Sequence, residues 1–316
     1  MDRSVTFRAG ASDAGNTLGV FLRQRGVSRH ILTILKRTPE GILLNGEAAF
    51  TSRTLSAGDQ VTIFVKEAEP PSPVAALPLP FPVIYEDEDL LVVDKPSGMA
   101  IHPSQGHHDN TLANAAAWYF QQKGESFVFR CINRLDRDTT GLLILAKNAL
   151  SASILSAMLQ KRQIGRTYLA AVEGTLPESG VIDAPIGRVP GSLIERRVDP
   201  EGGDAARTRY RRLLCRQLPL PGGGQQTCSL AAIRLETGRT HQIRVHMKSI
   251  GHPLAGDTLY HPETQLLPRQ GLHSCALDFP HPVTGEAMQF FSPLPKDMAA
   301  LFPGAAGSAG EIPEVI

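Results

Sequence analysis

The segment "NRLDRDTTGLLILAKN", residues 133–148, places charged and hydroxyl side chains directly before a strongly apolar run. Arg134 precedes Asp136 by two residues, so its guanidinium can pair with that carboxylate or hold a phosphate. An aspartate in a loop more often caps a turn, but Thr139 and Thr140 already supply capping groups here. We therefore single out Asp136 as a candidate reacting group, because a positioned carboxylate can act as a nucleophile or a base.

A second polar segment, "TGRTHQIRVHMKSIG" at residues 237–251, has helical spacing, with Thr240 as the expected N-cap. Arg244 lies in the first turns of this helix. His241 and His246 are five residues apart, about 140° around a helix, whereas paired helical metal ligands are four apart. We therefore expect no metal site in this segment.

Tyr168 belongs to "RTYLAAVEG", whose alternation predicts a strand with Arg166 and Tyr168 on one face. Taken alone, a strand tyrosine is more often a packing residue than a catalytic one. The chain contains no phosphate-binding glycine loop, dinucleotide-binding glycine motif, serine-hydrolase elbow or zinc-peptidase motif. The pattern argues against a nucleotide cofactor and against serine hydrolase or zinc peptidase chemistry.

The elements that must position these groups lie between residues 81 and 298. "GLLILAK" is short and apolar enough for a central strand, and "NALSASILSAMLQKR" is an amphipathic helix beginning at Asn148. Strands and helices do not alternate strictly. This order predicts an α+β domain with a mixed, largely antiparallel sheet flanked by helices.

Three further segments are expected outside that domain. Residues 1–66 predict a small α/β unit with two basic helices and a hairpin. Residues 67–80 are rich in proline and predict a linker. Residues 299–316 are small and weakly hydrophobic, so we expect a disordered tail.

The composition is that of an ordinary globular protein, with 42% apolar and 20% charged residues. No run is long and apolar enough for a membrane span or a secretory leader. The four cysteines are scattered, which favours reduced thiols. We expect a cytoplasmic monomer. The net charge is only +1, but basic residues gather in local clusters. These clusters favour an acidic partner, although the net charge of the whole chain does not.

Together these residues resemble the RluA family of RNA pseudouridine synthases. Five segments match in order: "DKPSGMAIHP", "NRLDRDTTGLLILAKN", "QIGRTYLAAVEG", "LETGRTHQIRVHMKSIGHPLAGDTLY" and "LHSCALDFPHPVTGEAMQF". Residues 16–66 resemble the alpha-L RNA-binding domain. The resemblance implies an isomerase that converts uridine in RNA to pseudouridine. Because nothing is oxidised or consumed in that reaction, no metal or organic cofactor is expected.

The resemblance also implies roles for individual residues. Asp136 corresponds to the catalytic aspartate, acting at C1′ of a flipped-out nucleotide, and Arg244 to the arginine that pairs with it. Tyr168 corresponds to the tyrosine that stacks on the base. Arg134 is expected to act on the backbone of the flipped nucleotide.

The remaining expected substrate-binding residues are Asn133 and Thr139 in the same loop, and Arg23, Arg25 and Arg29 in the N-terminal unit. Asn133 stands where many members have histidine, and Thr140 where many have serine. These two departures put the identity of the substrate in doubt rather than the activity.

Several alternatives stay open at this point. A carboxylate at the anomeric carbon can bond covalently or remove a sugar proton. Family analogy favours large-subunit ribosomal RNA over transfer RNA. A non-catalytic RNA-binding or ribosome-assembly factor, or an N-glycosidase that releases the base, are rival functions.

Overall fold

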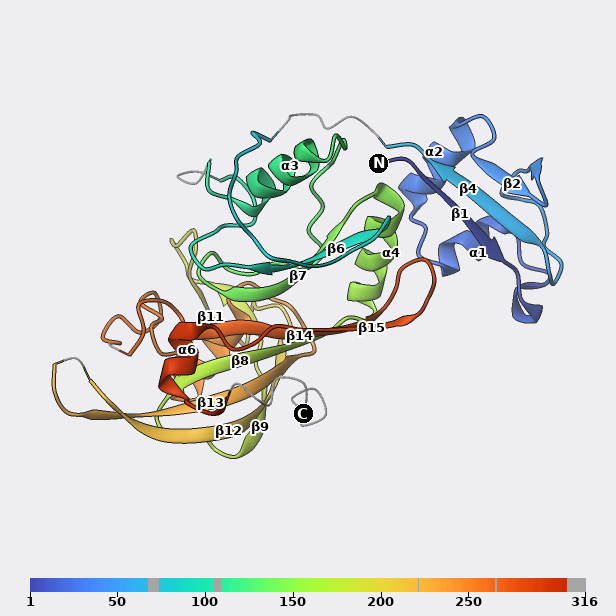
Figure 1. Cartoon of the computed structure of the whole chain (residues 1–316). Helices are drawn as coiled ribbons and strands as arrows, with labels where there is room; N and C mark the ends of the chain where they lie inside the picture. The colour runs from blue at the N-terminus through green and yellow to red at the C-terminus, as the bar shows by residue number, and fades with distance from the viewer. Residues whose placement is uncertain (68–73, 105–108, 221, 265, 306–316) are drawn as a thin grey trace.

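The computed structural model describes residues 1–67, 74–104, 109–220, 222–264 and 266–305. A small N-terminal unit lies at one end of the molecule, beside a much larger sheet (Figure 1). Among the described residues, no helix is both long and apolar enough to cross a membrane.

The N-terminal unit is a four-stranded antiparallel sheet with two helices. Its elements are β1 (Arg3–Arg8), the 3-10 turn η1 (Ala11–Asp13), α1 (Leu18–Gln24), α2 (Arg29–Arg37), β2 (Ile42–Leu44), β3 (Glu47–Ala48) and β4 (Gln60–Val65). The strand order is β1-β4-β2-β3. Gly26, at φ +85°, lies in the turn between the helices, and Ser28 caps α2 by accepting from the N–H of Ile31. The sequence predicted both helices but not β1.

The larger part contains a nine-stranded sheet in the order β5-β6-β7-β14-β8-β13-β12-β9, with β15 paired to β14. Its strands are β5 (Val83–Glu86), β6 (Leu90–Lys95), β7 (Thr140–Ala146), β8 (Gly165–Glu173), β9 (Ser179–Asp183), β12 (Arg207–Pro219), β13 (Gln225–Leu235), β14 (Leu272–Pro280) and β15 (Ala287–Phe291). Within the described residues, β7 and β14 form its parallel pair and the other pairs are antiparallel. The predicted fold class is therefore confirmed.

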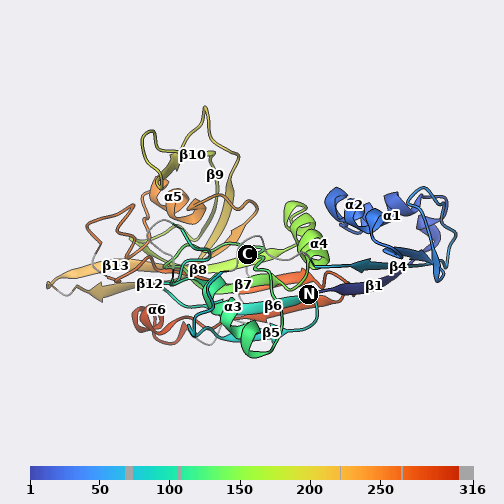
Figure 2. The same ribbon diagram turned by 90° about the horizontal axis from the view of Figure 1, so that it is seen from above.

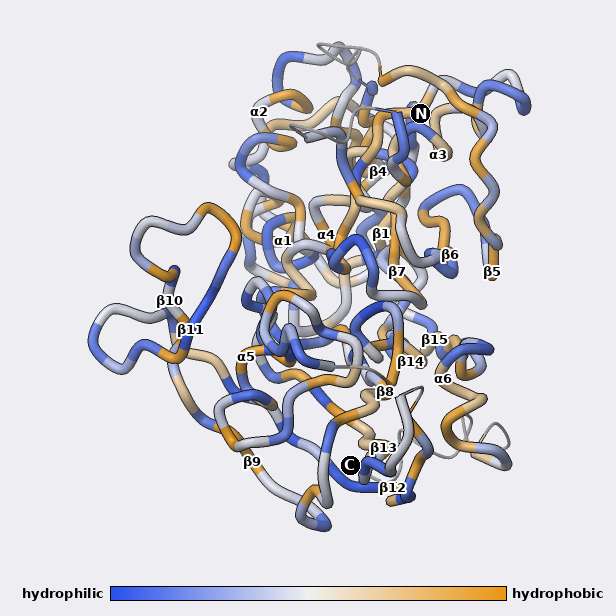
Figure 3. Tube along the Cα trace, turned by 90° about the vertical axis from the view of Figure 1, so that its left-hand side faces the viewer, coloured by the Kyte–Doolittle hydropathy of each residue, from blue (hydrophilic) through white to orange (hydrophobic). Residues whose placement is uncertain are grey.

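Helices cover both faces of this sheet. They are α3 (Leu112–Gln122), α4 (Ala149–Gln160), α5 (Gln242–Ser249) and α6 (Lys296–Leu301). A separate pair of strands, β10 (Ile186–Arg188) and β11 (Arg196–Val198), projects beside α5 (Figure 2 and Figure 3).

β7 is the central strand of the core, and each of its seven residues is buried. Alternation sends Leu143 and Leu145 into the apolar cluster that contains α3 and α5. It sends Leu142 and Ile144 into the cluster that contains α4. A strand buried on both faces is continuously apolar, which explains the run after Asp136.

Gly141 opens β7 at a point where two backbones nearly touch. Its φ is +111°, and a Cβ built on it would lie 2.3 Å from the carbonyl oxygen of Ser274 on β14. Only glycine tolerates both conditions. The sequence predicted a sharp bend at Gly141, and the structure adds this close strand approach, which fixes where the loop before β7 ends.

The predicted start of the C-terminal tail needs correction. The tail was expected to begin at residue 299, but α6 continues to Leu301 and Phe302 is fully buried in the core. Residues 306–316 lie outside the described part of the chain. In the predicted linker, the described residues after 73 pack on α3, where the Asn114 side chain donates to the Ala75 carbonyl at 2.9 Å.

The N-terminal unit is docked on the rest of the molecule rather than merely tethered. One continuous apolar cluster contains Leu32 and Leu35 of α2 together with Ile154 and Met158 of α4. Ion pairing adds to this contact, since Arg3 of β1 binds both carboxylate oxygens of Asp89 at 2.9 and 2.7 Å. Asp89 is only 2% exposed.

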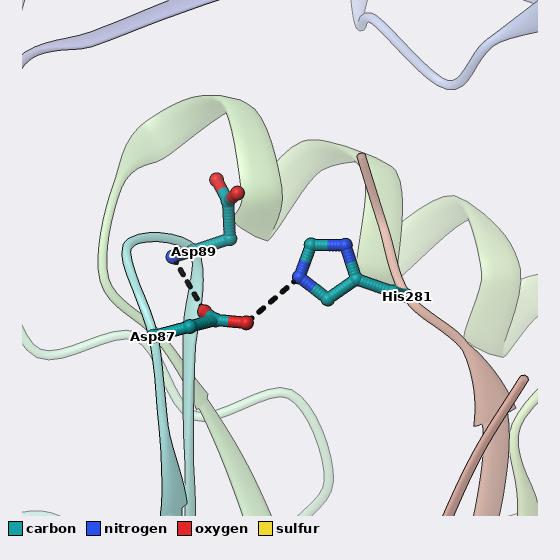
Figure 4. A group of neighbouring side chains, drawn as sticks. All are labelled: Asp87, Asp89 and His281. Carbon is teal, nitrogen blue, oxygen red and sulfur yellow. Dashed lines mark hydrogen bonds and ion pairs between the residues drawn. The ribbon is translucent and has the colours of Figure 1, made fainter. Parts of the chain in front are cut away.

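Asp87, Asp89 and His281 lie close enough together to resemble a cation site (Figure 4). The Asp89 carboxylate, however, points away from Asp87 (Figure 4), and its oxygens accept from Arg3, Asn148 and Ser151. The Asp87 carboxylate accepts from the Asp89 and Leu90 backbone N–H groups, the Tyr85 hydroxyl and the His281 ring. The carboxylate oxygens of Asp87 and Asp89 are therefore already occupied by hydrogen bonds. Through Arg3, these residues form a junction between the N-terminal unit and the larger part of the chain.

Replacing Arg3 should therefore destabilise the whole molecule. In Arg3→Met, Asp89 loses its cation while it stays buried, which costs about 3 kcal/mol of unfolding free energy. Arg8→Met is the matched control, because Arg8 is exposed on the same strand. Urea denaturation of both variants measures the difference, and equal midpoints would contradict the proposed importance of the junction.

Candidate active site

A cavity of about 280 Å³ opens where the loop before β7 faces β8 and the start of α5. The residues that line it are Ile132, Asn133, Arg134, Leu135, Asp136, Thr139, Leu159, Arg166, Tyr168, Leu235, Gly238, Arg239, Thr240, His241, Gln242, Ile243, Arg244 and Leu272. Segments far apart in the sequence, including both polar segments singled out from it, therefore meet in one place.

Arg244 forms the central ion pair of this cavity. Its Nη1 donates to Asp136 Oδ2 at 2.9 Å, while its Nε and Nη2 each donate to Asp257 at 2.8 Å. Arg244 is only 6% exposed, and Asp257 is 1% exposed. Burial opposes the charge on Arg244, but the Asp257 hydrogen bonds and the Asp136 charge raise its pKa above the usual value.

This geometry gives the two aspartates different tasks. The paired contact with Asp257 fixes the plane of the Arg244 guanidinium, because bidentate pairs specify orientation. One N–H of Arg244 is then left for Asp136, whose side chain is 27% exposed and lines the cavity. Asp136 is accordingly the carboxylate that a ligand can reach.

The backbone of the loop before β7 is held by two buried cations. Lys95 is fully buried and donates to the carbonyls of Pro96, Met99 and Arg137 at 2.7 to 2.9 Å. Burial lowers its pKa to about 7. Arg269 donates to the Asp138 carbonyl at 3.0 Å. The contacts to Arg137 and Asp138 hold the two residues that follow Asp136 and limit how far its backbone can move.

His241 adds a third polar group beside Asp136. Its Nδ1 lies 2.8 Å from the Tyr260 hydroxyl, and its Nε2 lies 3.8 Å from Asp136 Oδ2. Tyr260 already accepts the backbone N–H of Arg196 on β11, so its own proton suits His241 Nδ1. Burial lowers the pKa of His241 despite Asp136, which favours a neutral ring with its proton on Nε2.

The start of α5 differs from the prediction. His241 occupies the N-cap with φ +57° and makes no capping hydrogen bond, so Thr240 is not the cap. The Gln242 side chain anchors the first turn in another way, by accepting from the Arg239 N–H and donating to the Arg207 carbonyl. Both ring nitrogens of His246 are engaged, with Thr208 and the Ala184 carbonyl, so His246 is a buried structural residue.

Tyr168 lies on β8 and forms a wall of the same cavity, with 4% of its surface exposed. Burial raises the pKa of its hydroxyl above the usual value. The ring therefore presents a neutral phenol to the cavity, flat enough to stack on a planar base.

Two donors near the cavity lack partners among the described residues. Asn133 is 2% exposed; its Oδ1 accepts the Ile144 N–H at 2.9 Å, but its Nδ2 is buried without an acceptor. The Nε of Arg166 is also buried without one. Unsatisfied buried donors are costly, so both suit acceptors on a bound molecule. Arg134 is exposed at the cavity, and Thr139 Oγ1 accepts from Gln270 at 3.3 Å.

The three arginines predicted in the N-terminal unit lie outside the cavity and are not equivalent. Arg23 and Arg29 are exposed. Arg25 instead lies over the Phe21 ring at 3.5 Å and binds Asp13 at 2.9 Å. Its contacts give Arg25 a structural role in its own unit, so we exclude it from any proposed ligand surface.

Sequence reasoning missed several members of the site. Asp257 lies in "GDTLY", inside a recognised segment, but no spacing linked it to Arg244. Lys95 is in "DKPSGMAIHP", a recognised segment in which no role was assigned to it. His241 was considered only as a metal ligand. A buried charge in each case needs a distant partner, and the sequence shows no such pairing.

Comparisons with known proteins agree on one family. The family model described as RNA pseudouridylate synthase matches residues 89–249. A protein of Bacillus subtilis (strain 168), the uncharacterised RNA pseudouridine synthase YjbO, is 38% identical over 289 residues, covering 91% of this chain and 99% of its own. The ribosomal large subunit pseudouridine synthase D of Nitrosomonas europaea is 39% identical over 270 residues, covering 82% of this chain and 75% of its own.

A solved structure shows the same arrangement. Human RNA pseudouridylate synthase domain containing 1 superposes with a TM-score of 0.55 at 26% identity, covering 72% of this chain and 86% of its own.

The Arg244–Asp257 pair should behave as a structural unit. Arg244→Met leaves the buried Asp257 charge unpaired and should cost about 3–5 kcal/mol of unfolding free energy. The double variant Arg244→Met with Asp257→Leu removes both charges and should recover most of that stability. Chemical denaturation tests this, and a double variant no more stable than Arg244→Met would refute the pairing argument.

Proposed function

The chain belongs to the RluA-type family of RNA pseudouridine synthases, isomerases that act on uridine in RNA, and on this premise we propose that Asp136 attacks the nucleotide sugar. The observation that supports this role is the single hydrogen bond from a fixed Arg244 to a carboxylate that lines a cavity. A carboxylate held in this way can approach an anomeric carbon without first breaking a bidentate pair.

The reaction detaches uracil from C1′ and rejoins it through C5, so charge develops on the sugar as the glycosidic bond breaks. Asp136 can stabilise that charge by bonding to C1′ or by removing a sugar proton. Arg244 keeps the carboxylate aimed throughout, since Asp257 holds the guanidinium in place. The neutral His241 adds an N–H beside the same oxygen without adding a second full charge.

The detached base must stay in the cavity and turn over before it reattaches. Tyr168 provides a flat buried wall against which uracil can stack. Uracil has two carbonyl acceptors, which match the unpaired donors Asn133 Nδ2 and Arg166 Nε. Retention of the base separates this function from an N-glycosidase that releases it.

We also propose the RNA class and the place of action. Three of the relatives that cover 82% of this chain are named ribosomal large subunit pseudouridine synthase D, which supports large-subunit ribosomal RNA as the substrate, in the cytoplasm. Arg134 at the cavity mouth is expected to hold the backbone of the flipped nucleotide. Arg23, Arg29 and the rest of the N-terminal unit are expected to bind RNA away from it.

A non-catalytic RNA-binding factor is not favoured. That reading expects a broken set of active-site residues, whereas Asp136, Tyr168 and Arg244 meet in one cavity. The match of the family model across the loop, β8 and α5 supports the same conclusion.

Asp136→Asn should abolish pseudouridine formation while RNA affinity changes little, because the amide keeps the shape of the side chain but loses its charge. Asp138→Asn is the control, since Asp138 pairs with Arg137 outside the cavity lining. Mapping of pseudouridine in treated large-subunit RNA measures both variants. Turnover by Asp136→Asn at the wild-type rate would refute the assignment.

Tyr168→Phe should separate the ring from the hydroxyl. If the hydroxyl accepts the C5 proton while passing its own proton to a neighbouring acceptor, the variant keeps KM but loses about 10²- to 10⁴-fold in kcat. Because burial raises the pKa of Tyr168, kcat of the wild type should stay flat between pH 7 and 9 rather than rise as a phenolate forms. Tyr168→Leu, which also removes the ring, should raise KM. A Phe variant with wild-type kcat would leave stacking as the role of Tyr168.

A further inference from the structure

We propose that a groove between α2 and α4 binds the sugar-phosphate backbone of the substrate RNA, alongside the catalytic cavity. This interdomain groove, of about 660 Å³, has one wall from the N-terminal unit and one from the larger part of the chain. The inference rests on the proposed function, and it deepens that function by adding an RNA contact made by both parts together.

The charge of the groove suits a polyanion. Arg23, Arg29, Lys66 and Lys161 line it, and all four are exposed. Over the described ranges, none of these four cations has an acidic partner within ion-pair distance. The acid of the groove, Glu67, is neutralised by a bidentate contact with Arg130 at 2.6 and 2.9 Å. Phosphates complement such an excess of positive charge.

The α4 wall lets a backbone approach closely. Five of the α4 residues that line the groove have small side chains: Ala149, Ala152, Ser153, Ser156 and Ala157. With so little bulk in the way, phosphates can reach both the cations and the hydroxyl of Ser156, which are typical phosphate-binding groups. Such contacts position an RNA without reading its sequence.

The groove leads to the cavity. Leu159, in the last turn of α4, lines the catalytic cavity, whereas Gln160 and Lys161 directly after it line the groove. α4 has 12 residues and is about 18 Å long. RNA lying along α4 would therefore bring a nucleotide a few positions away to Asp136.

The walls are held at a fixed spacing. The Ser153 hydroxyl accepts the Ser28 N–H at 2.9 Å and donates to the Gly26 carbonyl at 2.8 Å. A Cβ at Gly26 would lie 3.1 Å from Ile154 Cα, so the backbones are nearly in contact. The shared apolar cluster and the Arg3–Asp89 pair add to this contact. The groove is thus formed before RNA arrives, and little ordering is required on binding.

The test is the salt dependence of binding to an in-vitro transcript of large-subunit ribosomal RNA, with Lys161→Gln and with Lys161→Gln combined with Lys66→Gln. The slope of log K against log salt is negative, and each lost phosphate contact should make it shallower by about 0.7–0.9. At 0.1 M salt this corresponds to about five- to eightfold weaker binding for each lysine. KM should rise in parallel while kcat at saturating RNA is unchanged.

Lys296→Gln is the matched control, because Lys296 is an exposed lysine on α6, far from the N-terminal unit (Figure 1). Its slope should equal that of the wild type. Unchanged slopes for both groove variants would overturn the groove, and so would a fall in kcat without a rise in KM. Failure of the wild type to form pseudouridine on any RNA would instead refute the proposed function, while the binding slopes would stand.

Discussion

The geometry of the site depends on how one buried guanidinium divides its donors. Arg244 gives two N–H groups to Asp257 and one to Asp136. A single carboxylate partner would engage Arg244 from both oxygens and withdraw from the cavity, because bidentate pairing is the stronger arrangement. Asp257 occupies that position, so Arg244 holds Asp136 by one oxygen, which leaves the other for the proposed chemistry. Asp257 thus leaves Asp136, the proposed reacting acid, available to a ligand in the cavity.

This division demands rigid support from both directions. On the Asp136 side, Gly141 allows β7 to approach β14 closely, and Lys95 holds the carbonyl beside the reacting residue. On the Arg244 side, α5 begins at a left-handed His241 and is anchored by Gln242. An error of about 1 Å in either segment would misplace the carboxylate relative to the sugar. The loop before β7 is thus held rigidly against the buried strand that follows it.

Much of this could be predicted from the sequence. The unbroken apolar run of β7, the capping Asn148 of α4 and the lack of strict alternation predicted the core and the fold class, since these signals are local. Recognised segments singled out Asp136, Arg134, Tyr168 and Arg244, and all four line one cavity. The partners of buried charges were not found, because Asp257 and Lys95 acquire their meaning only from contacts across the fold. The tail boundary failed because Phe302, in a weakly hydrophobic segment, is buried by distant residues.

The docking of the N-terminal unit has a consequence for the nascent chain. The contact between Ser28 and Ser153 spans 125 positions, so the small unit leaves the ribosome about 10 s before the helix that completes its surface, at typical elongation rates. During that interval the apolar side chains of α2 that later pack on α4 face water. Translation speed across the intervening segment would then influence the yield of native protein.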